Sequence, residues 1–293
     1  MERLLSRGDE VVVVDDLNDF YDPALKKKNL SDVRKTGDFR FVERDLRKGV
    51  EDLLPVDRII HLAARPGVRP SIHQAELYHD VNVNASLSLF EAARKTGTPR
   101  IIFASSSTVY GNHPVIPFPE DASPLKPISP YGATKVAGEN YLRVYSELHG
   151  IQATILRFFN AYGPRQRPDM AVSIFADRIR TGQEITLFGD GSIERDYTYI
   201  EDILQGIEGA LDHPENFAVY NLGESRTIPI SHLIELLEEN LGKKATIEYQ
   251  PGHPADVKKM CASIDRARRN LGYDPQVPIE EGIRRFVSSL ESA

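Results

Sequence analysis

The sequence has 293 residues, of which 41% are hydrophobic and 27% charged, a composition typical of a globular protein and not of a disordered or fibrous one. Its formal net charge of -7 argues against broad contact with a phosphate backbone, so we expect no nucleic-acid partner. Cys261 is the only cysteine, which excludes an intrachain disulfide and a thiolate zinc site, and no metal site is expected.

The sequence contains no apolar run close to the roughly 20 residues of a membrane-spanning helix. Residues 1–8 also lack the apolar stretch of a signal peptide. We therefore expect a cytoplasmic protein with no membrane partner.

Short β-branched runs alternate with helical patterns along the first half of the chain. A long helix is predicted at residues 130–149, with Pro130 in its first turn and Gly150 as its stop. The strands are almost entirely apolar, which is typical of a parallel sheet that helices cover on both faces. The predicted fold class is therefore α/β, a doubly wound parallel sheet. The predicted strands are residues 11–15, 39–43, 58–61, 100–104 and 151–157.

Beyond Asn160 the pattern becomes less regular. Strands are predicted at residues 184–188 and 245–249, while a helix at 202–211 and a strand at 217–221 return to the main sheet. This order predicts two interleaved domains. The larger one comprises residues 1–160 and 197–222, and the smaller one residues 161–196 and 223–293.

Tyr131 and Lys135 lie four residues apart in the predicted helix, after a polar stretch at residues 105–108 that follows a predicted strand. Residues at this spacing share one face of a helix, so the lysine ammonium can lie near the phenol and favour its ionised form. Ligands of doubly wound sheets bind at the carboxyl ends of the strands, where the polar stretch also falls. The alternative interpretation of residues 105–108 is a polar turn that caps the strand.

Taken with motifs spread along the chain, this pair resembles the active site of the extended short-chain dehydrogenase/reductase family, and within it of the nucleotide-sugar epimerases. The resemblance covers essentially the whole sequence. The matching segments, in the family's order, are residues 14–17, 61–64, 82–84, 105–111, 131–135, 157–160, 162–165 and 195–202.

The resemblance implies that Tyr131 takes a sugar hydroxyl proton while a hydride passes to NAD, with Lys135 supporting the phenolate. Ser106 and Thr108 would hydrogen-bond the reacting oxygen. The larger domain would be an NAD-binding, Rossmann-like domain and the smaller one would bind the nucleotide sugar. Further NAD contacts are implied for Asp16, Leu46, Asn82, Ser105, Tyr131, Lys135 and Phe158.

Three other positions are candidates for the cofactor site. Asp15 ends a strand, where a carboxylate accepts hydrogen bonds from ribose and repels a 2′-phosphate, so NAD is favoured over NADP; the alternative is a turn former. Asp45 matches the family position beside adenine and is equally a helix N-cap candidate. Leu62, Ala63 and Ala64 suit a backbone close to the cofactor, or simply tight packing.

The reaction is predicted from Thr108. Related dehydratases and decarboxylases carry an acidic residue at this position, so threonine favours epimerisation at the sugar 4-position through a transient keto sugar. For the UDP-sugar substrate, the resemblance implies that Arg195 and Asn160 lie near the diphosphate and Asp256 near the nucleoside ribose. A surface arginine that is merely solvated is the alternative for Arg195.

The sugar itself is predicted from segments 18–23 and 65–71, which are most similar to UDP-glucuronate 4-epimerases. These enzymes hold a sugar carboxylate, for which Arg69 and Arg167 would provide the countercharge. Either arginine is equally well interpreted as a structural ion-pair partner. A UDP-glucose/UDP-galactose 4-epimerase is the alternative function.

The resembling enzymes begin with a strand and a glycine-rich turn that binds the cofactor pyrophosphate, and residues 1–8 contain neither. We therefore expect a sheet without the usual first strand, and weak NAD affinity or low solubility. An incomplete sequence, a sheet completed in another way, and a degenerate, non-catalytic relative are the open explanations. The family also implies a homodimer, built from the helices around residues 73–95 and 130–149.

Overall fold

A four-stranded parallel sheet forms the centre of the computed structural model, which describes residues 1–252 and 257–291. The strand order is β10-β5-β4-β3. Ser106 at the end of β4 lies opposite Phe158 at the end of β5, so the carboxyl ends of the strands meet at one edge. The strands are β3 (Ile59–His61), β4 (Arg100–Ser106), β5 (Gln152–Phe158) and β10 (Phe217–Leu222).

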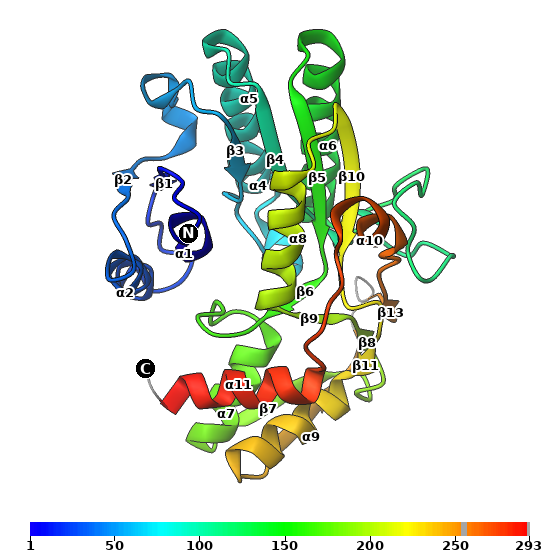
Figure 1. Cartoon of the computed structure of the whole chain (residues 1–293). Helices are drawn as coiled ribbons and strands as arrows, with labels where there is room; N and C mark the ends of the chain where they lie inside the picture. Colours follow the sequence, from blue (N-terminus) through cyan, green and yellow to red (C-terminus); the bar gives the residue numbers. More distant parts are fainter. Residues whose placement is uncertain (253–256, 292–293) are drawn as a thin grey trace.

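Helices cover both faces of this sheet (Figure 1). The helices α5 (Ala85–Thr96) and α6 (Pro130–His149) pack on one face, while α8 (Ile200–Asp212) and α10 (Asp265–Leu271) lie on the other. The chain enters α5 through α3 (Val68–His73), α4 (Ala75–His79) and a π-helical turn, η3 (Asp80–Asn84). Helix α6 ends where Gly150 adopts a left-handed conformation with φ of 69°, which glycine tolerates without strain.

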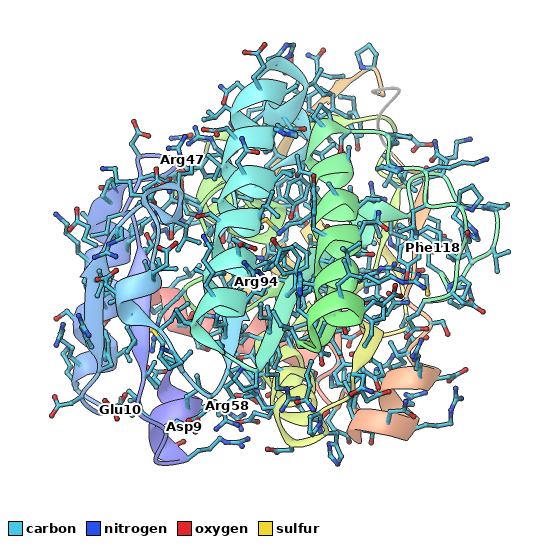
Figure 2. All side chains as sticks on the ribbon, turned by 90° about the horizontal axis from the view of Figure 1, so that it is seen from above. Asp9, Glu10, Arg47, Arg58, Arg94 and Phe118 are labelled. Atoms are coloured by element: carbon cyan, nitrogen blue, oxygen red, sulfur yellow. The ribbon has the colours of Figure 1, made fainter. Side chains whose placement is uncertain are left out.

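The N-terminal elements form a separate two-stranded parallel sheet. They are α1 (Glu2–Ser6), β1 (Val12–Asp15), α2 (Pro23–Arg34) and β2 (Arg40–Glu43), followed by the short turns η1 (Leu46–Lys48) and η2 (Glu51–Leu53). Arg58 donates to Asp9 over 2.7 Å, and Arg47 pairs with Asp80. These ion pairs attach the small sheet to the rest of the chain, and Figure 2 shows Asp9 beside Arg58.

A second hydrophobic core lies in the lower part of Figure 1, away from the main sheet. Side chains such as Phe175, Leu237 and Phe286 form it. Its helices are α7 (Ala171–Thr181), α9 (Ile230–Leu241) and α11 (Ile279–Glu291). Its strands pair as β7 (Glu184–Phe188) with β12 (Thr246–Gln250), β6 (Asn160–Tyr162) with β9 (Tyr197–Tyr199), and β8 (Glu194–Arg195) with β11 (Ile228–Pro229) and β13 (Lys259–Met260).

The predicted fold class, α/β with a doubly wound parallel sheet, is confirmed, and so is the return of α8 and β10 to that sheet. The predicted strands appear with shifts of one or two residues at their ends. The interleaved domain boundaries stay a prediction. Within residues 1–252 and 257–291, no helix combines the length and apolarity needed to span a membrane.

Candidate active site

Tyr131 and Lys135 project from the first turns of α6. The Ser129 side chain accepts a hydrogen bond from the backbone N–H of Gly132 and so fixes the start of the helix. Lys135 is buried, and its Nζ donates to the carbonyl oxygen of Ala104 over 2.7 Å. The same Nζ lies 5.9 Å from the centre of the Tyr131 ring. The lysine ammonium is therefore held beside the phenol by the end of β4.

Two hydroxyl groups from the carboxyl end of β4 complete this cluster. Ser106 caps the short turn η4 (Ser107–Val109), and its Oγ accepts hydrogen bonds from the backbone N–H and the Oγ1 of Thr108, over 3.2 and 3.0 Å. Ser106 also hydrogen-bonds the Tyr131 phenol. The structure thus brings together the four predicted catalytic residues, and it also shows the strand-capping turn that was their alternative interpretation.

Burial dominates the electrostatics of the pair. It raises the pKa of Tyr131, while the Ser106 hydrogen bond and the charge of Arg167 lower that pKa. Burial lowers the pKa of Lys135 to about 8, with Glu139 acting in the opposite direction. The net direction for Tyr131 differs from the sequence expectation, because desolvation of the phenolate outweighs the nearby charges. Further positive charge is needed to make this phenol a base near neutral pH.

Asp15 and Asp16 lie at the carboxyl end of β1 and form a local turn. Asp15 Oδ1 accepts from the backbone N–H of Leu17 over 2.7 Å, and Asp16 Oδ1 accepts from Asn18. The predicted turn former is therefore present. The Asp15 side chain stays 48% exposed, with Lys26 Nζ at 3.9 Å, so the carboxylate remains open to a ligand.

Asp45 and Leu46 have structural partners. Asp45 caps η1 by accepting from the backbone N–H of Arg47, and it also forms an ion pair with the Arg47 guanidinium. Leu46 packs against a small cluster that contains Val50 and Leu89. The N-cap interpretation of Asp45 is the one that the structure contains, and the adenine contact stays a prediction.

The loop after β3 exposes apolar side chains to solvent, and hydrogen bonds to Asn82 hold its backbone. Leu62 is 57% exposed, and Ala63 is exposed beside it. Asn82 Oδ1 accepts from the backbone N–H of Arg65 over 2.6 Å, and Asn82 Nδ2 donates to the Arg65 carbonyl and to Thr134 on α6. Asn82 thus holds this loop against the helix that carries Tyr131.

These features fit the family's dinucleotide. An exposed carboxylate at the end of β1 suits ribose hydroxyls, and the uncovered Leu62 and Ala63 suit a flat ring system. Arg65 Nε is buried and has no hydrogen-bond partner in the described part of the chain, which leaves a donor for a polar ligand group.

The arginine candidates occupy different surroundings. Arg167 forms an ion pair with Asp169, and its charge also acts on Tyr131, Tyr78 and Tyr21. The Arg69 guanidinium lies 3.8 Å from the centre of the Phe188 ring, which connects α3 to β7. Of these two arginines, Arg167 is thus the one whose charge acts on Tyr131.

The predicted diphosphate contacts lie at the start of the smaller core. Arg195 Nη1 donates to the carbonyl oxygens of Glu194 and Val257, over 2.9 and 2.7 Å. Asn160 begins β6, and its backbone N–H donates to the carbonyl of Asp196. Asp256 lies outside the described residues. The ligand contacts of Asn160, Arg195 and Asp256 stay predictions.

A buried pair of opposite charges, Glu139 and Arg157, escaped the sequence interpretation. Glu139 follows Lys135 by one helical turn and pairs with Arg157 on β5. The signals were present, since Glu139 repeats the four-residue spacing and Arg157 is a charge within an apolar strand.

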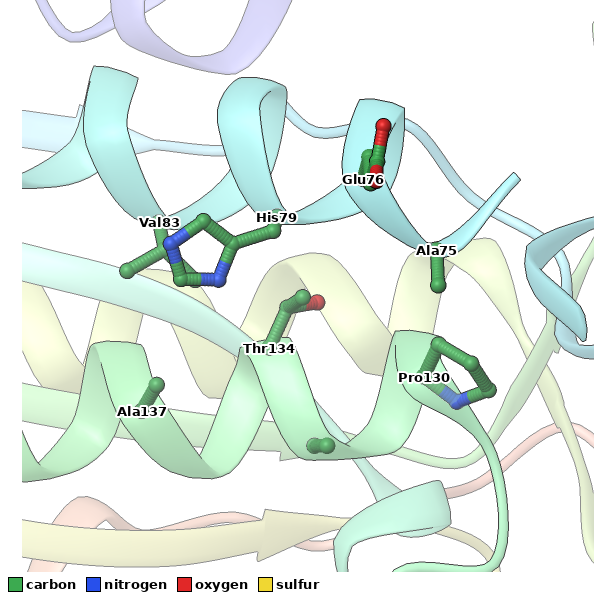
Figure 3. Close-up of a pocket in the computed structure, with 8 residues that line it drawn as sticks. Ala75, Glu76, His79, Val83, Pro130, Thr134 and Ala137 are labelled. Atoms are coloured by element: carbon green, nitrogen blue, oxygen red, sulfur yellow. The ribbon is translucent and has the colours of Figure 1, made fainter.

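An open groove lies between α4 and α6 (Figure 3). Small or apolar side chains such as Ala75, Val83, Ala133 and Ala137 line it, together with His79. None of the four predicted catalytic side chains lines this groove, so it is distinct from the candidate active site.

The chain is similar to known proteins over nearly its whole length. Residues 1–286 match the family described as GDP-mannose 4,6 dehydratase. A UDP-glucuronate 4-epimerase of Thermodesulfobacterium geofontis is 39% identical over 294 residues, which cover 98% of this chain and 90% of the relative. UDP-glucuronate 4-epimerase 5 of Arabidopsis thaliana is 37% identical over 307 residues, with 97% and 70% covered.

Solved structures agree as well. A UDP-glucuronic acid 4-epimerase of Bacillus cereus, a mutant solved with a fluorinated UDP-glucuronic acid and NAD, has a TM-score of 0.91 and 32% identity over 99% of this chain and 94% of its own. The UDP-glucose 4-epimerase of Thermotoga maritima, solved with UDP-glucose, has a TM-score of 0.90 and 31% identity over the same shares. The chain belongs to this family of short-chain dehydrogenase/reductase-type epimerases and dehydratases.

Proposed function

We propose that this protein is an NAD-dependent UDP-sugar 4-epimerase, and that its substrate is UDP-glucuronate, which it converts to UDP-galacturonate. The observation that carries the reaction class is the convergence of Ser106, Thr108, Tyr131 and Lys135 at the carboxyl end of β4. Within this family, that cluster is suited to removing a proton from a sugar hydroxyl.

Tyr131 is the group that accepts and returns the hydroxyl proton. Ser106 Oγ and Thr108 Oγ1, 3.0 Å apart, hold the reacting oxygen in line with the phenol. Lys135, fixed by the Ala104 carbonyl, contributes positive charge that favours the phenolate. NAD, held by Asp15 and the open side of the loop after β3, would accept and return the hydride and would add the positive charge of its nicotinamide ring.

Epimerisation is favoured over dehydration by the surroundings of Thr108. A dehydration needs a further acid or base at the reacting carbon, and Thr108 offers only a hydroxyl that is already bonded to Ser106. With no carboxyl at this position, the simplest outcome is return of the hydride to the other face of the keto sugar.

The uronate specificity is supported by the position of Arg167. Its charge acts on the Tyr131 phenol. In a hexuronate the carboxylate is attached to carbon 5, which is bonded to the carbon that carries the 4-hydroxyl. A guanidinium near Tyr131 is thus well placed for that carboxylate. Because Arg167 already pairs with Asp169, its charge is partly compensated, which favours a neutral-sugar UDP-glucose 4-epimerase as the second candidate.

Rates with UDP-glucuronate and UDP-glucose, measured with added NAD, separate the two candidates. We expect faster conversion of UDP-glucuronate and, in Arg167→Met, a loss of at least tenfold in kcat/KM for that substrate, since one carboxylate contact is worth about 1.5–3 kcal/mol. The matched control is Arg165→Met, which removes an exposed arginine paired with Glu2. Faster conversion of UDP-glucose by the parent protein would replace the uronate assignment by the neutral-sugar one.

A further inference from the structure

The buried face of α6 carries a second charged residue one turn after Lys135. Glu139 and its partner Arg157 have side chains only 7% and 4% exposed. Arg157 Nε and Nη2 donate to the two carboxylate oxygens of Glu139 over 3.0 and 2.8 Å. The Ser105 hydroxyl donates to the same carboxylate. This bidentate pair therefore joins α6 to β5, with β4 as a third participant.

Arg157 extends the connection across the sheet to its edge strand, β10. Its Nη1 donates to the Tyr110 hydroxyl over 2.9 Å and to the Glu120 carbonyl over 3.0 Å. The Tyr110 hydroxyl in turn donates to Asn221 Oδ1 on β10 over 2.7 Å. A buried network whose members have partners on several elements fixes their relative positions.

The network lies next to the Lys135 ammonium. From β4, the Ala104 carbonyl and the Phe103 ring face Lys135, with Nζ 5.1 Å from the ring centre. On α6 the titratable neighbours are Tyr131 and Glu139, and the charge of Glu139 acts on Lys135.

Two further charged or titratable side chains in this region come from β3 and β5. His61 on β3 is buried, and burial together with Lys135 lowers its pKa to about 3, so its ring is neutral. Arg157 on β5 compensates the charge of Glu139. The Glu139 carboxylate thus acts on Lys135, and Arg157 acts on that carboxylate.

We propose that Glu139 and Arg157 are positioning residues for Lys135: the pair seats α6 on β4 and β5, and its balanced charge keeps the ammonium protonated beside Tyr131. The catalytic meaning of this inference rests on the proposed function, but the effect on Lys135 does not. A purely structural pair would hold the helix without setting the protonation of Lys135.

The test is an NMR titration of the full chain labelled with ¹³Cε-lysine, with the Lys135 signal assigned through Lys135→Arg. The parent midpoint is expected near pH 8. Glu139→Gln removes the carboxylate and leaves the Arg157 cation, so the midpoint falls by about one pH unit. The double variant Glu139→Gln/Arg157→Met removes both charges, so the midpoint returns towards the parent value. Glu147→Gln, which breaks an exposed pair with Arg143 on the same helix, leaves it unchanged.

The inference is overturned if the Lys135 midpoint is unchanged in Glu139→Gln. It is also overturned if the midpoint of the double variant falls as far as that of the single variant. If Glu139→Gln does not fold, Arg157→Gln decides, since it leaves the Glu139 carboxylate without its cation and the midpoint is expected to rise; an unchanged midpoint there also overturns the inference. The failure of the proposed function is seen separately, as a parent protein that converts no UDP-sugar with added NAD while Lys135 titrates as described.

Discussion

Tyr131 and Lys135 are held to different degrees, which suits their different tasks. Lys135 is buried and bonded to the Ala104 carbonyl, so its charge is fixed in place. Tyr131 remains partly exposed and faces Ser106. In the proposed reaction, the lysine therefore acts as a stationary charge, while the phenol would contact the substrate.

Replacing Tyr131 by phenylalanine tests the proton-transfer role. We expect turnover to fall by about 10³-fold, since the variant lacks the group that exchanges the proton, while NAD affinity changes by less than threefold. Product formation and NAD binding by calorimetry measure the two effects. Tyr141→Phe, on the exposed side of the same helix, is the control and is expected to be fully active. Full activity in Tyr131→Phe would refute the assignment.

At the residue scale, local motifs were predictable and long-range partners were not. The cluster of Ser106, Thr108, Tyr131 and Lys135 follows from two short segments whose spacing is visible in the sequence. The Glu139–Arg157 pair depends on the register between β4 and β5, which places Arg157 opposite Ser105. No local pattern fixes that register.

Among the elements, α6 lies directly against the sheet at Gly138. A Cβ atom on Gly138 would lie 2.5 Å from the end of the Phe103 ring, so the helix and β4 fit only with glycine at this position. Phe103 also faces the Lys135 ammonium. The absence of a side chain at Gly138 thus allows α6, which carries Tyr131 and Lys135, to pack closely on β4.

Gly138→Ala is expected to destabilise the fold by about 1–3 kcal/mol, because overpacking outweighs the gain of about 1 kcal/mol in helix propensity. Urea unfolding followed by circular dichroism measures this change. Asn140→Ala, an exposed substitution on the same helix, is the control and is expected to change stability by less than about 0.5 kcal/mol. Equal stability of Gly138→Ala and the parent would show that α6 shifts freely on β4.

Long elements were predicted better than short ones. The apolar strands and α6 carry clear periodic signals, and the structure contains them within one or two residues. The short strands β8, β11 and β13 were missed, because segments of two residues form only when distant parts of the chain pair. The π-helical turn η3 was also unforeseen, and it places Asn82 against Arg65 and Thr134.

At the scale of the whole molecule, the strands predicted for the main doubly wound sheet are divided between two sheets, β1–β2 and β10-β5-β4-β3. The β1–β2 pair is joined to the larger sheet by ion pairs such as Arg58–Asp9 and Arg47–Asp80, while its strands pair only with each other. Val14 of β1 also packs against the apolar cluster of Val50, Leu89 and Ala92, so salt is expected to weaken only the ion-pair part of this attachment. The predicted weak affinity for NAD stays a prediction.

The outer face of α6 supports the predicted homodimer. Tyr141, Val144 and Leu148 are 41%, 46% and 71% exposed and form one stripe along the helix, continuing the groove against α4. We expect a dimer in sedimentation equilibrium and a monomer for the double variant Val144→Asp/Leu148→Asp. Val115→Asp, in an exposed loop, is the control and leaves the dimer intact. A monomeric parent, or a double variant that still dimerises, would contradict this arrangement.

The most direct test of the epimerase assignment follows a deuterium label at the sugar 4-position. UDP-glucuronate carrying deuterium on that carbon is incubated with the protein and a catalytic amount of NAD, and the product is analysed by NMR and mass spectrometry. The account predicts UDP-galacturonate that retains the deuterium at the 4-position, because the same hydride leaves and returns. Loss of the label to solvent, or a dehydrated or decarboxylated product, would contradict it.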